Sequence, residues 1–85
     1  MIYKLIIRRK AQKQLSKLPP REYKKVKTKI YELAENPRPF GSKQLKDRNG
    51  TRIRVGNYRV IYDIFDDTLT ILVISIGHRK KVYIK

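Results

Sequence analysis

Three arginines stand at regular spacing around a predicted tight turn. The segment reads RIRVGNYRVIYDI, in which Gly56 and Asn57 are typical central residues of a two-residue hairpin. Counting outward from that turn places Arg54 directly opposite Arg59. Because side chains alternate between the two faces of a strand, Arg52 lies on the same face as this pair. The sequence therefore predicts a cationic patch on one face of a hairpin.

Two arginines opposite each other carry an energetic cost. Like charges in this position destabilise a hairpin by roughly 0.2–1 kcal/mol, so folding alone does not favour them. A bound anion would offset the cost, and replacing Arg59 with alanine would then leave the fold no less stable. Phosphate suits arginine, which contacts it through two parallel hydrogen bonds and stays charged. We therefore expect the patch to hold a phosphate group.

The other face of the same hairpin is apolar and predicts a core. It carries Ile53, Val55, Tyr58, Val60 and Tyr62. A plainer interpretation of the arginines stays open, since Arg52 and Arg54 could be ordinary solvent-facing positions in a basic protein. Arg59 could equally form a salt bridge with Asp63, two residues along the same face.

Composition limits the class of protein. The chain has 85 residues, which predicts a single domain over residues 1–85, and its 22 Lys and Arg against 7 Asp and Glu give a net charge of +15. Such a charge indicates a partner that is nucleic acid, an anionic membrane or an acidic protein. Cysteine is absent, which excludes disulfides and a thiol nucleophile. No apolar run is long enough for a signal peptide or a membrane span, so we expect a cytoplasmic location.

Apolar periodicity predicts the elements that position the arginines. We expect a strand at residues 2–7, a helix from Arg9 to the Pro19-Pro20 pair, and a second helix from Pro20 or Arg21 to about residue 36. Three antiparallel strands then follow in residues 51–83, with a second turn at Asp66-Asp67. Gly77 is predicted to interrupt the last strand, with a polar bend at residues 78–81 and a short strand at residues 82–84.

These elements predict an α+β fold. An N-terminal strand and an α-helical hairpin would pack on one face of a small curved antiparallel β-sheet, leaving the arginine face open. The segment of residues 38–50 is rich in turn residues and reads as an irregular loop. Within it Lys43 and Lys46 flank Leu45, which we expect to anchor the loop in the core.

The order of elements and three motifs resemble the RelE/ParE superfamily of toxins from type II toxin-antitoxin modules. The motifs are ENPRPFGSKQLK, RIRVGNYRVIYDI and the terminal ISIGHRKKVY, and the resemblance covers essentially the whole chain. Within this superfamily the RelE branch cleaves messenger RNA in the ribosomal A site, and the ParE branch poisons DNA gyrase. The resemblance thus implies a RelE-like fold and a toxin function.

The resemblance also implies candidate catalytic residues. The basic pair before the hairpin turn falls on Arg52 and Arg54, and the arginine after it on Arg59. The arginine after the terminal glycine falls on Arg79, and the near-terminal tyrosine on Tyr83. This chain departs from the RelE pattern in two respects, because its strand pair is arginine where that pattern has lysine, and its bend between residues 77 and 83 is shorter. Arg79 and Tyr83 have a plainer interpretation as residues that tie down the C-terminus.

Cleavage of RNA by the neighbouring 2′-hydroxyl needs alignment, cations beside the developing phosphorane, and proton transfer at two oxygens. Arginine supplies the cations but is a poor base, because its pKa exceeds about 12. The base could be Lys46, Tyr83, His78, the substrate or solvent. Tyr83 could instead stack on an unpaired base.

The sequence predicts a ribosome-dependent mRNA endonuclease toxin that uses no metal and no cofactor, with an acidic antitoxin as its partner. Further RNA contacts are predicted at Lys43, Lys46, His78, Lys80 and Lys81. For His78 a structural or merely exposed role is the stronger interpretation. The Asp66-Asp67 pair reads as a turn and not as a metal site. Two other functions stay open: a ParE-like gyrase poison without nuclease activity, and a non-catalytic RNA-binding module.

Overall fold

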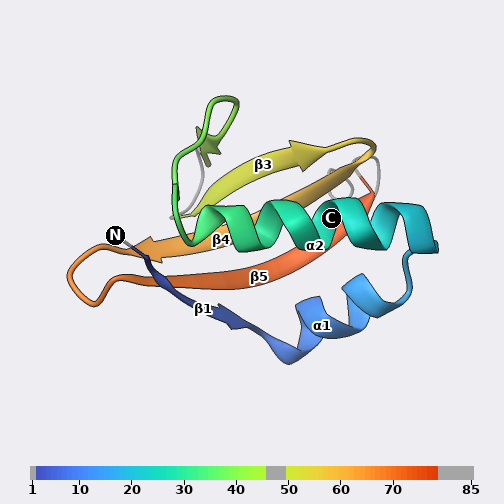
Figure 1. Ribbon diagram of the computed structural model, residues 1–85, viewed down its shortest axis with the longest axis horizontal. Helices are drawn as coiled ribbons and strands as arrows, with labels where there is room; N and C mark the ends of the chain where they lie inside the picture. The colour runs from blue at the N-terminus through green and yellow to red at the C-terminus, as the bar shows by residue number, and fades with distance from the viewer. Residues whose placement is uncertain (1, 46–49, 79–85) are drawn as a thin grey trace.

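The computed structural model describes residues 2–45 and 50–78 of the 85-residue chain (Figure 1). Within these ranges, two helices and five strands form a two-layer α+β domain. The elements are β1 (Lys4–Ile7), α1 (Arg9–Ser16), α2 (Pro20–Leu33), β2 (Lys43–Gln44), β3 (Thr51–Val55), β4 (Tyr58–Phe65) and β5 (Thr70–His78). The predicted α+β class, the helical hairpin and the three-strand meander are confirmed.

The five strands form one sheet in the order β1-β5-β4-β3-β2. β1 runs parallel to β5, with Lys4 paired to Thr70, whereas the other neighbouring strands are antiparallel. The predicted antiparallel pairing is confirmed for β3 to β5 and is corrected at β1, whose parallel pairing makes the sheet mixed. The direction of β1 depends on the strand far along the chain that it meets, and local periodicity carries no information about that pairing.

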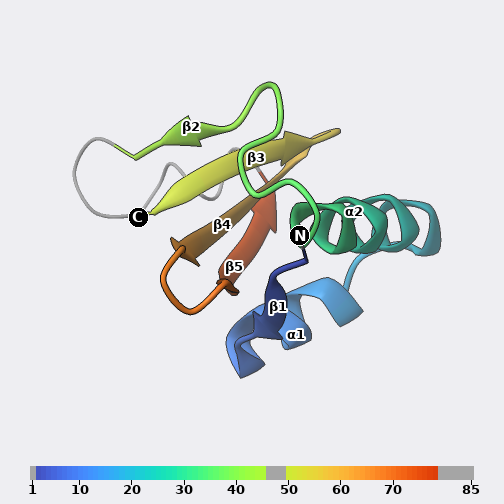
Figure 2. The same cartoon turned by 60° about the vertical axis from the view of Figure 1, so that its left-hand side comes forward.

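Both helices cover the same face of the sheet (Figure 2). Each begins after a residue with extended backbone, Arg8 and Pro19, and Pro20 occupies the first turn of α2, where its missing N–H leaves no hydrogen bond unmade. α1 ends at Ser16, earlier than the proline pair that was expected to stop it. In the described part of the chain, neither helix is long and apolar enough to cross a membrane.

The core lies between the helices and the apolar face of the meander. It is formed by Ala11, Leu15, Val26, Ile30, Leu33, Ile53, Val60, Tyr62, Ile71, Val73 and Ile76. Full burial of one large apolar side chain contributes about 1.5–3 kcal/mol, so this cluster is the main stabilising term. Gln14 of α1 adds a polar clamp, since its Oε1 accepts a 2.6 Å hydrogen bond from the Ile76 N–H on β5.

Strand β5 continues to His78 without interruption. Gly77 lies within the strand and pairs with Arg59, which corrects the prediction that this glycine breaks the strand. A glycine flanked by two paired neighbours weakens a strand but does not end it. The predicted bend after His78 and the short strand at residues 82–84 lie outside the described residues. Leu45 is half-buried and its N–H donates to the Gly50 carbonyl oxygen at 3.0 Å, but it is not part of the core cluster.

Candidate functional site

The hairpin between β3 and β4 has the register that the sequence predicts. Val55 pairs with Tyr58 and Arg54 pairs with Arg59. Gly56 has a φ of +62°, a conformation that glycine adopts without strain. The turn therefore fixes which side chains face each other, and it places two arginines in direct opposition.

The two opposed arginines differ sharply in exposure. Arg59 is only 4% exposed, whereas Arg54 is exposed and Arg52 is half-buried. The expectation of an open arginine face is thus wrong at Arg59. On its other side Arg59 faces Gly77 of β5, which has no side chain and leaves room for the arginine. A buried guanidinium has few orientations available, so its charge is directed more precisely than that of an exposed arginine.

A second basic row lies beside the first on the same face. Lys43 of β2 pairs with Arg52 of β3, and Arg52 pairs in turn with Ile61 of β4. Arg52 and Arg54 are two residues apart on β3, which is about 7 Å along a strand, so the two rows lie close together. The short strand β2 therefore adds Lys43, a predicted RNA contact, to the candidate surface.

His78 lies apart from this surface. It pairs directly with Tyr58, and the two rings pack edge to face with their centroids 5.5 Å apart. Tyr58 and Arg59 are consecutive, so their side chains point to opposite faces of β4. The structure therefore places His78 and Arg59 on opposite faces of the sheet.

The other predicted site residues lie outside the described ranges. These are Lys46, Arg79, Lys80, Lys81 and Tyr83. Their roles stay predictions from the sequence.

A groove opens along the part of the β3 edge that β2 does not cover. It has a volume of about 310 Å³ and is lined by Lys29, Phe40, Gly41, Lys43, Arg52, Ile53 and Arg54. Two predicted catalytic residues and one predicted RNA contact thus share a concave surface. The sequence analysis missed Lys29 and Phe40, although a lone aromatic residue among turn residues is a signal that could have found Phe40.

The family model described as ParE toxin of type II toxin-antitoxin system, parDE, matches residues 5–83. That range includes every described helix and all but the first residue of the described sheet. The chain belongs to the RelE/ParE superfamily.

Members of this superfamily match in both sequence and fold. The mRNA interferase toxin RelE of Escherichia coli K12 is 30% identical over 83 residues, which cover 95% of this chain and 87% of the relative. The toxin-antitoxin complex RelBE2 from Mycobacterium tuberculosis matches with a TM-score of 0.82 and 28% identity, over 93% of this chain and 100% of that chain. The archaeal RelE–RelB complex from Pyrococcus horikoshii OT3 matches with a TM-score of 0.82 and 27% identity, over 93% of this chain and 97% of that chain.

In this RelE/ParE chain, Arg38 forms an ion pair with Asp66 of the β4–β5 turn. Arg38 donates to Asp66 through both terminal nitrogens, with Nη2 2.8 Å from Oδ2, and Tyr3 donates its hydroxyl to Oδ1 at 2.6 Å. The hydrogen bonds from Arg38 and then Tyr3 hold the pKa of Asp66 below its usual value, and Asp66 in turn raises the pKa of Tyr3. Asp66 therefore ties the β4–β5 turn to the N-terminus and to the loop after α2.

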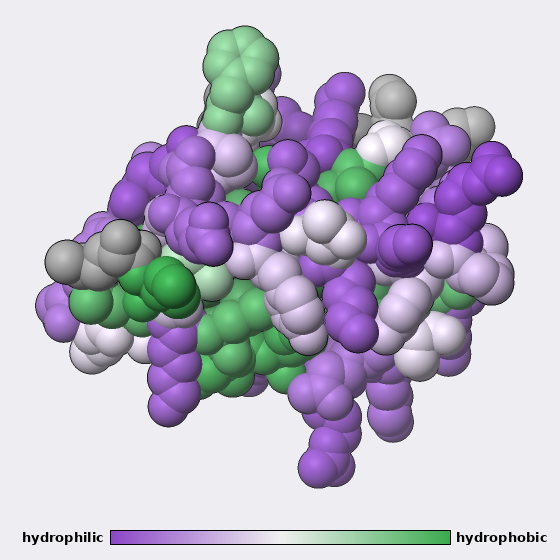
Figure 3. Space-filling view, viewed as in Figure 1, coloured by the Kyte–Doolittle hydropathy of each residue, from purple (hydrophilic) through white to green (hydrophobic). Residues whose placement is uncertain are grey.

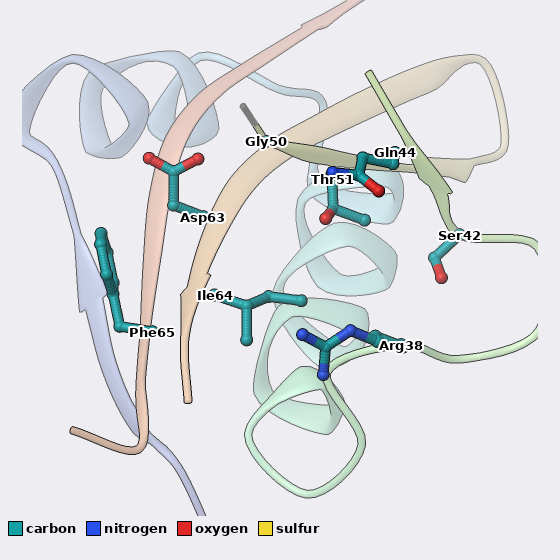
Figure 4. A pocket seen from close by; sticks show the side chains of 8 residues that line it. All are labelled: Arg38, Ser42, Gln44, Gly50, Thr51, Asp63, Ile64 and Phe65. Atoms are coloured by element: carbon teal, nitrogen blue, oxygen red, sulfur yellow. The ribbon is translucent and has the colours of Figure 1, made fainter. Parts of the chain in front are cut away.

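A larger cavity of about 580 Å³ lies at this end of the sheet (Figure 4). Arg38 and Ile64 extend into it from opposite sides, and Thr51 lies beside Gln44, with which it pairs. Among the described catalytic candidates, Arg52, Arg54 and Arg59 do not line this cavity. Among the described residues, no three His, Asp or Glu side chains gather in a way that could hold a metal ion.

Proposed function

We propose that this toxin is a ribosome-dependent mRNA endonuclease that cleaves RNA by attack of the 2′-hydroxyl. The observation that carries the proposal is the direct pairing of Arg54 with Arg59, beside the Lys43–Arg52 pair. A face with this concentration of positive charge is complementary to a phosphate that gains charge in the transition state. The relative named mRNA interferase toxin RelE, at 30% identity over most of both chains, supports the same reaction.

The difference in burial supports different roles for the two opposed arginines. Arg59 is 4% exposed and would stabilise the phosphorane charge from a fixed position. Arg54 is exposed and would contact a neighbouring phosphate together with Arg52. His78 lies on the opposite face, which argues against it as the general base. Lys46, Tyr83, the substrate or solvent then remain for proton transfer, with Arg79 as a further cation, and the proposed mechanism uses no metal.

The partner in this proposal is an acidic antitoxin. Related toxins have been solved in complex with RelB antitoxins. A chain with a net charge of +15 attracts an acidic partner over long range, which speeds association. We propose that the antitoxin gene lies next to the toxin gene and that its product suppresses the toxin and co-purifies with it.

A ParE-like gyrase poison is the second candidate. It is favoured by the matching family model, whose description names the ParE toxin. A non-catalytic RNA-binding module is the third, since a net charge of +15 would serve that function without a catalytic site.

The decisive experiment combines two measurements. RNA ends are mapped after brief induction of the toxin, and the effect of the toxin on purified gyrase is measured in a DNA supercoiling assay. The nuclease predicts new ends within translated messages and no effect on gyrase. Arg54→Ala serves as a folded variant with reduced cleavage, because this exposed side chain can be removed without opening the core. Inhibition of gyrase without new RNA ends would overturn the proposal in favour of the second candidate. The absence of both effects would favour the third candidate.

A further inference from the structure

Phe40 is the most exposed large apolar side chain in the described part of the chain. Its relative exposure is 105%, compared with 41–70% for Ile2, Ile6, Tyr31 and Phe65. It lies in the loop that rises between α2 and β2 in Figure 1, and the space-filling view of the same side shows a hydrophobic projection there, next to hydrophilic side chains (Figure 3). Exposure of a whole aromatic ring to water gains nothing for folding.

A tight turn holds Phe40 in this position. The Ser42 N–H donates to the Pro39 carbonyl oxygen at 3.0 Å, and Gly41 has a φ of +95°. These features place Phe40 and Gly41 at the two central positions of a β-turn whose second central residue needs positive φ. Apart from its two neighbours in the chain, nothing lies within 4 Å of the position that a side chain at Gly41 would occupy, so the turn stands clear of the body. The ring of Phe40 is therefore presented on a defined support.

Cations surround the turn on the side of the groove. The groove at the edge of β3 is lined by Phe40 together with Lys29 of α2, Lys43 of β2, and Arg52 and Arg54 of β3, and none of the described residues that line it is acidic. One helix and two strands contribute these charges. Positive charge around a fully exposed ring is complementary to the phosphates and bases of a nucleic acid, and binding of an acidic protein segment here is an outcome that the test below distinguishes.

We propose that this groove binds an unpaired nucleotide of single-stranded RNA, with its base stacked on Phe40 and the adjacent phosphates held by Lys29, Lys43 and Arg52. Aromatic rings beside basic grooves are the common solution for single-stranded nucleic acid, because every base has a flat face and every nucleotide a phosphate. The proposal rests on the proposed function for its substrate class. It adds a place beside Arg54 where the strand is held next to the opposed Arg54–Arg59 pair.

The absence of tryptophan from the sequence allows a direct test. Phe40→Trp introduces a single tryptophan whose fluorescence reports stacking, and Tyr31→Trp on α2 is the matched control at another exposed aromatic position. The probe is a short single-stranded oligoribonucleotide of mixed sequence, without ribosomes. We expect saturable quenching of Phe40→Trp by this probe, and little quenching by inorganic polyphosphate or by a blunt RNA duplex. Equal quenching in both variants, or equal quenching by polyphosphate, would overturn the proposal.

A second measurement uses affinity. Phe40→Ala should weaken binding of the oligoribonucleotide about five- to a hundredfold, the range that stacking of one base accounts for, and Phe40→Tyr should restore it. An unchanged affinity in Phe40→Ala, or a loss confined to antitoxin binding or self-association, would show that Phe40 does not stack on RNA. This measurement does not depend on cleavage. If the toxin binds RNA through Phe40 but cuts no message, the proposed function is refuted and the RNA subsite stands.

Discussion

The two ends of β4 use arginine in opposite ways. At the end near Gly56, Arg59 faces another arginine across the strand pair. At the end near Asp66, Arg38 meets a carboxylate at 2.8 Å, and a tyrosine hydroxyl completes the group. Both ends lie beside a tight turn of the same meander, so the difference does not arise from the type of local structure.

The comparison separates charge that serves the fold from charge kept for a partner. The Arg38–Asp66 pair neutralises itself and joins segments that are distant in the chain. The opposed Arg54–Arg59 pair concentrates positive charge on one face at a cost to the hairpin, and an anion bound there would offset that cost. Substitutions at the two ends should therefore affect different properties: activity at the first end and stability at the second.

The largest expected effect is at Arg59. Its replacement should slow single-turnover cleavage on programmed ribosomes by about 100- to 1000-fold, the usual loss for one preorganised charge contact. The burial of Arg59 revises the expectation that alanine would be harmless to the fold, because truncation of a buried side chain leaves a cavity.

Arg59→Met is therefore the better variant, since it keeps most of the volume without the charge. Thermal unfolding of this variant is the control for folding. A folded Arg59→Met protein that cuts at the wild-type rate would refute the assignment and would make both ends of β4 structural.

Tyr62 should make the Asp66 end sensitive to alkaline pH. Its ring is fully buried and its hydroxyl donates to the Pro37 carbonyl oxygen at 2.7 Å. Burial raises the pKa of Tyr62 from 10.0 to about 12, although Arg38 and Ser42 oppose the shift. As pH rises, the unfolded chain therefore loses the Tyr62 proton before the folded chain does. The contribution of Tyr62 to the free energy of unfolding is complete below pH 10 and is lost as pH rises toward 12.

A difference of about two pKa units corresponds to roughly 2–3 kcal/mol in the free energy of unfolding. Urea unfolding at pH 9 and at pH 11.5 should show a larger loss for wild type than for Tyr62→Phe. The variant also lacks one hydrogen bond, but that deficit does not vary with pH. Parallel losses in the two proteins would contradict the prediction.

Arg54→Ala should stabilise the fold slightly while it reduces activity. The side chain is exposed, so its removal opens no cavity, and relief of the repulsion with Arg59 is worth about 0.2–1 kcal/mol. Urea unfolding at low and high salt measures the effect, which should shrink at high salt because screening weakens the repulsion in wild type. A less stable variant would mean that Arg54 contributes to folding and that the two ends of β4 are alike.

The smallest effect is expected at Asp66. Asp66→Asn should lower the melting temperature slightly at neutral pH and leave cleavage unchanged, because the Arg38 pair is exposed and screened by water. The pKa of Asp66 is lowered in the folded state, so its contribution is present above the ordinary carboxyl value of about 4 and is lost as pH falls through the lower folded value. Melting curves across this acidic range should converge for the two proteins. A reduced cleavage rate would connect the Asp66 end to catalysis.

Local pattern in the sequence was sufficient for much of the fold. Alternation of apolar residues and the Gly56-Asn57 turn predicted the register of the hairpin, including the pairing of Arg54 with Arg59. The proline pair and the spacing of apolar residues likewise predicted the helical hairpin and the face that it covers. These features depend on neighbours within a few residues, and the preferences of the backbone and side chains act at that range.

Only the tertiary structure decided which arginine is buried and what surrounds Phe40. Arg54 and Arg59 have the same chemistry and the same face, but Arg59 lies on a central strand next to Gly77 and Arg54 lies on β3 near the edge. The parallel direction of β1 and the meeting of Lys29 with Phe40 in one groove also join distant segments. Burial and electrostatic environment depend on which segments meet in space, and that is settled by packing of the whole chain rather than by any local pattern.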